Sequence, residues 1–330
     1  MRKIFINAIA LAIMAGCAQS VPEDPPPADG SLETIRLPMG FIANVQYAPF
    51  YMAVEKGYYA QAGIEIEFDY SFETDGVALV GAGELPLAVV SGEQVLLARA
   101  QGIPVVYVMA WFQDYPIGLI SKSDAQISSP ADLDGKQIGL PGLFGASYIG
   151  LRALLYEAGI AEAQVQLDSI GFNQVQALSA DQVEVVTGYV NNEPLQLEAL
   201  GYEIEVIRVA DHVQLAANGI ITNESTLEAR PELVRKFIEA TLHGLADTIA
   251  DPDEAFEISK KYVEALALAT DEEAAVQREV LTMTIEFWQT SKPGFSEKAA
   301  WENMQVVLLE MGLLTEPLDL EAAFTNAFIP

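Results

Sequence analysis

Hydrophobic positions along the chain form short runs that alternate between the two-residue period of strands and the wider spacing of amphipathic helices. From residue 35 onward, four apolar runs have the length and composition of strands: Ile35–Met39, Ile64–Phe68, Pro86–Val90 and Pro104–Ala110. Segments with helical spacing separate these runs. Strands that alternate with helices predict a largely parallel sheet with helices on both faces.

The same alternation starts again at Ile117 and predicts a second sheet, whose strands are Ile117–Ser121, Lys136–Leu140, Gln164–Ile170, Val183–Tyr189 and Glu203–Val209. Ala216–Thr222 is predicted to return to the first sheet. The remaining residues have helical patterns, which predict helices over Pro231–Ala250, Pro252–Leu268, Asp271–Thr290 and Glu297–Met311. We therefore expect an α/β fold of two lobes, each a mostly parallel sheet flanked by helices, with a helical C-terminal tail. Residues 34–118 and 217–330 form the predicted lobe 1, and residues 119–216 form lobe 2. Two crossovers, Met109–Ser121 and Asp211–Thr222, are the expected hinges of a cleft between the lobes.

The N-terminus has the features of an export signal. Arg2 and Lys3 precede an apolar run from Ile4 to Met14, and small residues lead from there to Cys17. This order predicts a signal peptide over residues 1–16, and the run is shorter than the about 20 residues that a transmembrane helix needs. Residues 14–17 resemble the bacterial lipobox, although Met14 stands where Leu is usual. We expect an acylated Cys17 that anchors the chain to the cell membrane on its extracytoplasmic side; the alternative is an ordinary cleaved signal.

Two features of the sequence at and after Cys17 support a lipid anchor. Cys17 is the only cysteine of the chain, so it has no partner for an intramolecular disulfide. The segment 17–33 is rich in Pro and has no apolar period, which predicts a flexible tether between the membrane and the folded part.

Composition limits the partners of the folded part. Hydrophobic residues make up 51 % of the chain, which indicates a folded protein, and the formal net charge is -30. Such a surface repels nucleic acid and disfavours a strongly anionic ligand. The acidity also has a simpler explanation, which is solubility outside the cell.

Three sequence segments resemble segments that occur in the same order in a known protein family. They are the run Gln46–Tyr59 followed by Gly63–Glu67, the run Leu79–Ser91, and the run Pro130–Gly139. Similar phrases recur in the sulfonate-, nitrate- and thiamine-precursor-type solute-binding proteins of ABC importers. The resemblance implies a two-lobe periplasmic-binding-protein-like fold of type II, partnership with a permease and an ATPase, and a monomer without a cofactor.

Two further phrases, Gly142–Tyr148 and Gly188–Pro194, resemble the riboflavin-importer branch of that family. The implied ligand is a vitamin-like aromatic heterocycle, with riboflavin favoured and a thiamine pyrimidine precursor as the alternative. A sulfonate or nitrate ligand is disfavoured because few Lys or Arg residues fall in the loops of the cleft.

Candidate ligand-binding residues lie in the loops that leave the strands, since open α/β sheets bind ligands outside the carboxyl ends of their strands. Aromatic rings there can stack on a flat heterocycle, and amide, hydroxyl and carboxyl groups can bind its polar edges. For the aromatic candidates a place in the hydrophobic core is an equal alternative, and residues 192–194 also suit the start of a helix. The predicted ligand-binding residues are Asn44, Tyr47, Ser91, Glu93, Trp111, Tyr148, Phe172, Tyr189, Asn192 and Glu193.

An enzyme is the competing class, because the same fold resembles a pyrimidine synthase that carries a cluster of cysteines with iron. This chain has no such cluster, and His212 and His243 are its only histidines. No group of Cys, His and carboxylates has the spacing of metal ligands. We therefore predict a binding protein without catalytic residues or a metal. A purely structural lipoprotein is a third class, which the two-lobe pattern disfavours.

Overall fold

The structure is a computed structural model in which residues 31–330 are described. The predicted signal peptide, Cys17 and the tether up to residue 30 lie outside the described residues. Within residues 31–330, no helix has both the length and the apolar character required to cross a bilayer.

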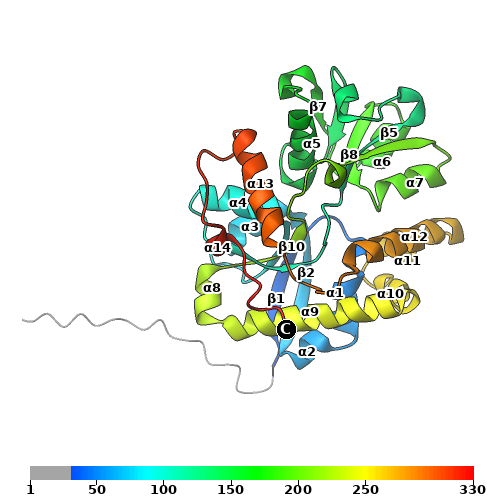
Figure 1. The fold of residues 1–330 in the computed structure, drawn as a ribbon. Helices are drawn as coiled ribbons and strands as arrows, with labels where there is room; N and C mark the ends of the chain where they lie inside the picture. The colour runs from blue at the N-terminus through cyan, green and yellow to red at the C-terminus, as the bar shows by residue number, and fades with distance from the viewer. Residues whose placement is uncertain (1–30) are drawn as a thin grey trace, which may run out of the picture.

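In residues 31–330, ten strands form three sheets. Figure 1 shows how the helices surround them. A parallel pair of β1 (Glu33–Gly40) and β2 (Ile64–Phe72) lies beside a three-stranded sheet in the order β3-β10-β4. The strands of the latter are β3 (Ala88–Ser91), β4 (Val105–Ala110) and β10 (Asn218–Asn223). We call these two sheets and their helices the first unit.

The second unit contains a five-stranded sheet in the order β7-β6-β8-β5-β9. Its strands are β5 (Ile117–Lys122), β6 (Gln137–Leu140), β7 (Gln166–Ser169), β8 (Val185–Tyr189) and β9 (Ile204–Arg208). Side chains alternate across this sheet as a strand requires. Ile117 and Leu119 join the main hydrophobic core, whereas Ile120 faces a smaller cluster with Val186.

The strand directions correct the prediction of mostly parallel sheets. Three of the pairs are parallel, but β10 is antiparallel to both β3 and β4, and β5 is antiparallel to both β8 and β9. The reason lies in the crossovers. Strands β4 and β8 end where the two units meet, whereas β5 and β10 are the first strands after each crossing and run away from that place.

Helices surround both units. The first unit has the short 3-10 turn η1 (Val45–Tyr47) and the helices α1 (Ala48–Glu55), α2 (Tyr58–Gln61), α3 (Glu73–Gly81), α4 (Gly92–Ala100), α8 (Glu224–Ala229), α9 (Pro231–Ala250), α10 (Pro252–Ser259), α11 (Glu264–Ala267), α12 (Asp271–Trp288), α13 (Lys298–Glu310) and α14 (Leu320–Ala323). The second unit has α5 (Gly145–Glu157), α6 (Gln174–Ser179), α7 (Glu193–Ala199) and the 3-10 turns η2 (Ser123–Ala125), η3 (Pro130–Leu133), η4 (Glu162–Gln164) and η5 (Val209–Asp211).

Helix α9 spans the base of the first unit and packs closely against α1 (Figure 1). Pro231 begins it, and Val234, Phe237 and Ile238 lie on its buried face at helical spacing. At Gly244 a Cβ atom would come within 2.1 Å of the Pro49 carbonyl oxygen, so only glycine allows this approach. The helix predicted for residues 252–268 is divided into α10 and α11, and Tyr262, which lies between them, stacks on Tyr51 with ring centroids 4.5 Å apart.

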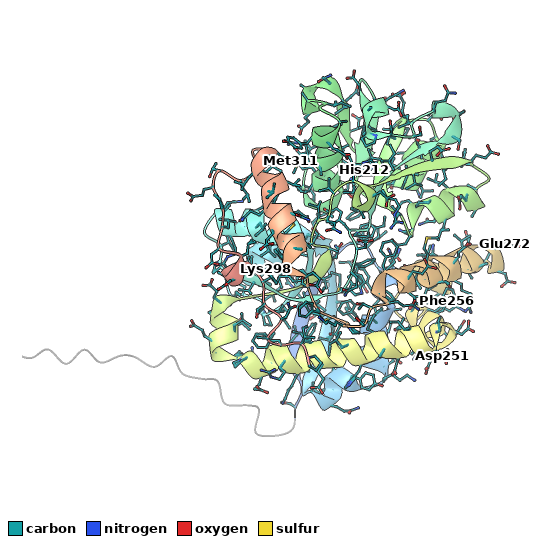
Figure 2. All side chains as sticks on the ribbon, in the orientation of Figure 1. His212, Asp251, Phe256, Glu272, Lys298 and Met311 are labelled. Atoms are coloured by element: carbon teal, nitrogen blue, oxygen red, sulfur yellow. The ribbon has the colours of Figure 1, made fainter. Side chains whose placement is uncertain are left out.

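Two C-terminal helices of the first unit also contact the second unit. Asn191 Nδ2, next to α7, donates to Thr284 Oγ1 of α12 at 2.7 Å, and both side chains are buried. At the end of α13, the Met311 carbonyl accepts from Arg152 Nη2 of α5 at 3.3 Å, and Met311 lies beside the second unit in Figure 2. The two units therefore share more than the two crossovers between residues 110 and 117 and between residues 211 and 218.

Candidate functional site

The ends of several strands meet between the two units and enclose two small cavities. The inner cavity has a volume of about 20 Å³ and is lined by Met39, Gly40, Phe41, Gln46, Tyr47, Glu73, Trp111, Tyr189 and Asn218. The outer cavity has a volume of about 50 Å³ and is lined by Gly40, Phe41, Phe72, Glu73, Pro141, Phe144, Gly145, Ala146, Ser147, Phe172, Gln174 and Tyr189. Four residues are common to both linings, so the cavities are neighbours along one cleft.

Aromatic rings from opposite units face one another across this cleft. Phe41 of the first unit stacks on Tyr189 of the second, with ring centroids 6.4 Å apart and planes at 24°. Phe172 meets the edge of Phe41 at 4.6 Å, and Phe144 meets Phe72 at 5.3 Å. Such contacts stabilise the approach of the two units by about 0.5–1.5 kcal/mol per pair beyond the area they bury.

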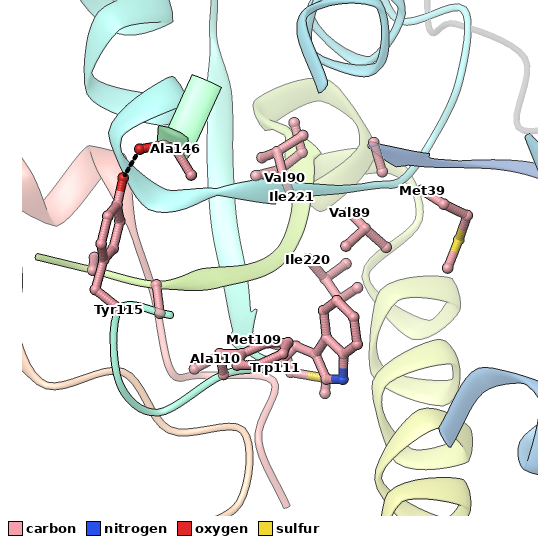
Figure 3. Packing of buried hydrophobic residues seen from close by; sticks show 14 of the residues in the cluster. Met39, Val89, Val90, Met109, Ala110, Trp111, Tyr115, Ala146, Ile220 and Ile221 are labelled. Atoms are coloured by element: carbon pink, nitrogen blue, oxygen red, sulfur yellow. Dashed lines mark hydrogen bonds between the residues drawn. The ribbon is translucent and has the colours of Figure 1, made fainter. Parts of the chain in front are cut away.

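The inner cavity is walled by a second aromatic pair. Tyr47 stacks on Trp111 with centroids 5.3 Å apart and planes at 18°, and its hydroxyl donates to the Met39 carbonyl at 2.7 Å. Trp111 follows β4 directly and packs against Ile220 and Met109 in the hydrophobic core (Figure 3). Both rings are held firmly, and one face of this cleft is therefore preformed.

Glu73 is the acidic residue of the cleft, and it lies at the start of α3. At Gly40 the backbone has a φ of +80°, and a Cβ there would come within 2.7 Å of Glu73 Cγ, so this glycine makes room for the carboxyl group. Glu73 Oε1 accepts from the Ser91 backbone N–H at 3.0 Å and from Asn218 Nδ2 at 3.1 Å. The carboxyl group also faces the start of α5 in the other unit, where a Cβ at Gly145 would lie 3.4 Å from Glu73 Oε2.

A second buried carboxyl group lies next to Glu73. The Ser91 hydroxyl is 2.7 Å from Glu73 Oε2 and also contacts Glu93 Oε1. Burial first, and the nearby charge of Glu93 second, raise the pKa of Glu73 from 4.5 to about 8; burial also raises the pKa of Glu93. Since one hydroxyl hydrogen cannot serve two carboxylates, the geometry favours a proton shared within the pair, in agreement with the raised pKa of both groups.

This network reaches the second unit through Tyr115. The Tyr115 hydroxyl lies 3.3 Å from Glu93 Oε2 and donates to the Ala146 carbonyl at 2.9 Å, as the dashed line in Figure 3 marks. Tyr115 belongs to the first crossover, between β4 and β5. The buried carboxyl pair is thus connected to both units and to the segment that joins them.

Glu193 is a third buried carboxyl group, and it lies behind Tyr189. Its Oε2 accepts from the Tyr189 backbone N–H at 2.7 Å and its Oε1 from Asn192 Nδ2 at 3.0 Å. Burial raises the pKa of Glu193 to about 7. These bonds hold the backbone that carries the Tyr189 ring into the cleft.

The predicted ligand-binding residues fall into three groups. Tyr47, Trp111, Phe172 and Tyr189 line the cavities. Ser91, Glu93, Asn192 and Glu193 are buried behind the lining and hold it through the bonds described above. Asn44 and Tyr148 are not in either lining: Asn44 Oδ1 accepts from the Gln46 backbone N–H, and the Tyr148 hydroxyl donates to Glu162 Oε2 in η4. Their role in ligand binding stays a prediction.

The predicted ligand-binding residues do not include four residues that are prominent in the lining of the inner cavity: Phe41, Gln46, Glu73 and Asn218. Phe41 and Glu73 directly follow the strands β1 and β2, so the rule that ligands bind at carboxyl ends of strands pointed to them. Asn218 begins β10 and therefore carried no such signal. Its position depends on the antiparallel direction of that strand.

The family model described as "NMT1/THI5 like" matches residues 44–255. The chain belongs to the NMT1/THI5-like family. It is 40 % identical to the riboflavin-binding protein RibY of Chloroflexus aurantiacus, over 100 % of this chain and 98 % of that one.

Other NMT1/THI5-like relatives differ in their names. The chain is 27 % identical to a formylaminopyrimidine-binding protein of Halalkalibacterium halodurans, over 98 % of each chain. It is also 27 % identical to a 4-amino-5-hydroxymethyl-2-methylpyrimidine phosphate synthase of Legionella pneumophila, over 90 % of this chain and 92 % of that one.

A solved structure supports the fold. The alkanesulfonate-binding protein SsuA of Xanthomonas axonopodis pv. citri superposes with a TM-score of 0.70 over 89 % of this chain and 99 % of that one, at 14 % sequence identity. This likeness shows that the NMT1/THI5-like chain has the predicted two-lobe periplasmic-binding-protein fold. Named relatives of this chain include both binding proteins and synthases.

A metal centre and another cavity are the two alternatives to the cleft. In residues 31–330 no group of three or more His, Cys, Asp or Glu side chains is arranged to hold a metal ion. A larger cavity of about 290 Å³ lies between α5, α13 and residues 212–214, where His212 Nδ1 pairs with Glu157 at 2.8 Å. Exposed Tyr156 and Val306 contribute to its walls, and it is open to solvent. The enclosed, aromatic cleft between the units is the better ligand site.

Proposed function

We propose that this protein is the extracytoplasmic solute-binding component of an ABC importer, and that it captures riboflavin or a similar flat heterocycle between its two units. The aromatic cleft and the 40 % identity to a riboflavin-binding protein support this proposal. In it, the ligand is released to a permease that an ATPase drives, and the protein acts as a monomer.

The observation that carries the proposal is the pair of rings on opposite walls of the cleft. Phe41 and Tyr189 have centroids 6.4 Å apart and nearly parallel planes. A flat ring inserted between them needs roughly 7 Å, which is two carbon–carbon contacts of about 3.5 Å each. A small separation of the two units is therefore enough to convert the direct contact into a sandwich around the ligand.

In the proposed function, the two units open and close around the ligand. We propose that residues 34–118 with 217–330 and residues 119–216 move as lobes about the two crossovers. The cavities of about 20 and 50 Å³ are smaller than a typical site for such a ligand, so entry requires opening. The contacts of Tyr115 and of α12 with both units would limit how far the lobes separate.

Fluorescence titration tests the proposed function. Riboflavin added to the purified protein is expected to lose fluorescence on binding, because its ring stacks on aromatic side chains, with saturation at micromolar concentrations or below. No quenching at micromolar riboflavin, together with saturable heat from an aminopyrimidine thiamine precursor in calorimetry, would reverse the order of the two ligands.

A pyrimidine precursor is the second candidate. The inner cavity is small, and the chain resembles a formylaminopyrimidine-binding protein over almost its whole length. The large aromatic lining of the outer cavity favours the larger ring system instead.

We further propose that the protein binds its ligand without chemical change. The groups around the cleft are aromatic rings, amides and carboxyl groups whose hydrogen bonds hold the structure together. Incubation with riboflavin or an aminopyrimidine for several hours, followed by chromatography, is expected to return the ligand intact. Conversion of either ligand would establish an enzyme instead, as the likeness to a synthase allows.

The proposed location depends on Cys17. We propose that this residue is acylated and anchors the protein outside the cytoplasmic membrane, with the Pro-rich segment as a tether. The protein with Cys17→Ala, expressed in a bacterial host, is expected to leave the membrane fraction and to lose incorporation of labelled palmitate. Retention of both properties in the variant would exclude the anchor.

A further inference from the structure

Three buried polar atoms in the lining of the inner cavity have no hydrogen-bond partner. They are Gln46 Nε2, Trp111 Nε1 and Asn218 Oδ1, and the three residues are 4 %, 4 % and 3 % exposed. Buried polar groups are almost always paired, because an unpaired one loses its bond to water without compensation. Only eight such atoms occur in residues 31–330, and three of them belong to the nine residues around this one cavity.

The surrounding contacts determine which atom of Asn218 is free, and in Gln46 the buried atom without a partner is the amide nitrogen. Asn218 Nδ2 donates to Glu73 Oε1 at 3.1 Å, so the amide oxygen of Asn218 is left as an acceptor. The Trp111 ring is fixed by its stack on Tyr47, and its backbone N–H donates to the Asn218 carbonyl at 3.0 Å. Trp111 and Asn218 therefore lie on neighbouring segments, and Gln46 directly precedes Tyr47.

The free atoms form a set of two donors and one acceptor. Gln46 Nε2 and Trp111 Nε1 can only donate, whereas Asn218 Oδ1 can only accept. A complementary ligand edge contains two acceptors and one donor. Among flat heterocycles, an imide edge has this composition, because a ring N–H lies between two carbonyl oxygens.

We propose that the inner cavity recognises the imide edge of the ligand; this inference rests on the function proposed above. The two carbonyl oxygens accept from Gln46 Nε2 and Trp111 Nε1, and the ring N–H donates to Asn218 Oδ1. The pyrimidine-dione end of riboflavin has this edge. An aminopyrimidine edge instead presents one amino donor beside one ring-nitrogen acceptor, so one of the two protein donors is left without a partner.

The continuity of the two cavities extends the assignment to the rest of the ligand. Gly40, Phe41, Glu73 and Tyr189 line both cavities. A ring whose imide edge lies in the inner cavity therefore passes between Phe41 and Tyr189 into the outer, more aromatic one. Specificity then resides mainly in the inner cavity, and stacking energy mainly in the outer one.

The decisive experiment compares two flavins on the unaltered protein. Riboflavin and riboflavin methylated at N3, the imide nitrogen, are titrated by fluorescence quenching. The methylated compound is expected to bind at least tenfold more weakly, because it leaves the Asn218 amide oxygen unpaired and adds a methyl group to a cavity of about 20 Å³.

A variant tests one donor separately. Gln46→Met keeps the length of the side chain and removes its donor, so riboflavin affinity is expected to fall about 5- to 50-fold. Gln113→Met is the matched control, because Gln113 is exposed on the first crossover, and its affinity is expected to be unchanged. Thermal unfolding of both variants verifies that they fold.

The outcomes separate this inference from the proposed function. Equal affinity for riboflavin and its N3-methyl derivative overturns the imide assignment and leaves riboflavin binding intact. Unchanged affinity in the folded Gln46→Met protein contradicts it as well. Absence of riboflavin binding together with tight binding of an aminopyrimidine overturns both.

Discussion

Replacement of Glu73 by Gln probes the buried carboxyl pair. Folding raises the pKa of Glu73 from 4.5 to about 8, mainly through burial and further through the charge of Glu93. The folded chain therefore binds this proton more tightly than the unfolded chain does. The resulting stability is present in full below pH 4.5 and is lost as the pH rises through about 8.

The size of the effect follows from the pKa values of the two states. Between pH 5 and pH 8, Glu73 alone lowers the free energy of unfolding by about 3 to 4 kcal/mol, at about 1.4 kcal/mol per pKa unit. The amide of the Glu73→Gln variant resembles the protonated acid. Its oxygen can accept from the Ser91 backbone N–H, and its NH₂ group can donate to the Ser91 hydroxyl, which remains free to donate to Glu93.

Urea denaturation at pH 5, 6.5 and 8 measures the prediction. The variant is expected to gain stability relative to the wild type by about 3 to 4 kcal/mol as the pH rises from 5 to 8. Glu84→Gln, at an exposed position in the same unit, is the control and should follow the wild type at every pH. Parallel pH curves for wild type and the Glu73→Gln variant would show that Glu73 ionises normally and would refute the reasoning.

Two further substitutions test the cleft and the contact between the units. Tyr189→Ala removes one wall of the proposed ring sandwich. It is expected to weaken riboflavin binding about 10- to 100-fold in the fluorescence titration, because stacking and burial are lost. Tyr156→Ala, at an exposed position on α5, is the control and should leave the affinity unchanged; equal losses in both variants would argue against the sandwich. Thr284→Val leaves the buried Asn191 amide without its partner and is expected to cost about 1–3 kcal/mol in urea denaturation. The exposed Thr282→Val on the same helix is the control, and a loss no larger than that of the control would mean that the bond contributes little.

Much of the fold could be predicted from sequence, because local patterns report local environment. Helix α9 begins and ends where the pattern predicts, since Pro231 starts it and its apolar positions recur at helical spacing. The strands of both units were also located by their apolar runs. The helix predicted for residues 252–268 is instead interrupted near Tyr262, whose ring stacks on Tyr51, a contact between residues far apart along the chain.

Residues of the candidate site could be predicted only where they lie next to the carboxyl end of a strand in the sequence. All four aromatic candidates that line the cavities lie at or after the end of a strand: Tyr47, Trp111, Phe172 and Tyr189. Asn218 could not be found in this way, because it begins a strand. It reaches the cleft only since β10 runs antiparallel to its neighbours, and strand direction is not encoded in a run of apolar residues.

The sequence by itself determined which segments become strands and helices, that an α/β pattern occurs twice, and that aromatic residues are concentrated at strand ends. Only the tertiary structure decided the directions of β5 and β10, the approach of Phe41 to Tyr189, and the burial of Glu73 beside Glu93. The physical reason is the distance along the chain between the residues that interact. Hydrophobic periodicity records which face of a segment avoids water, whereas ring pairing and a raised pKa depend on which distant segments are packed together.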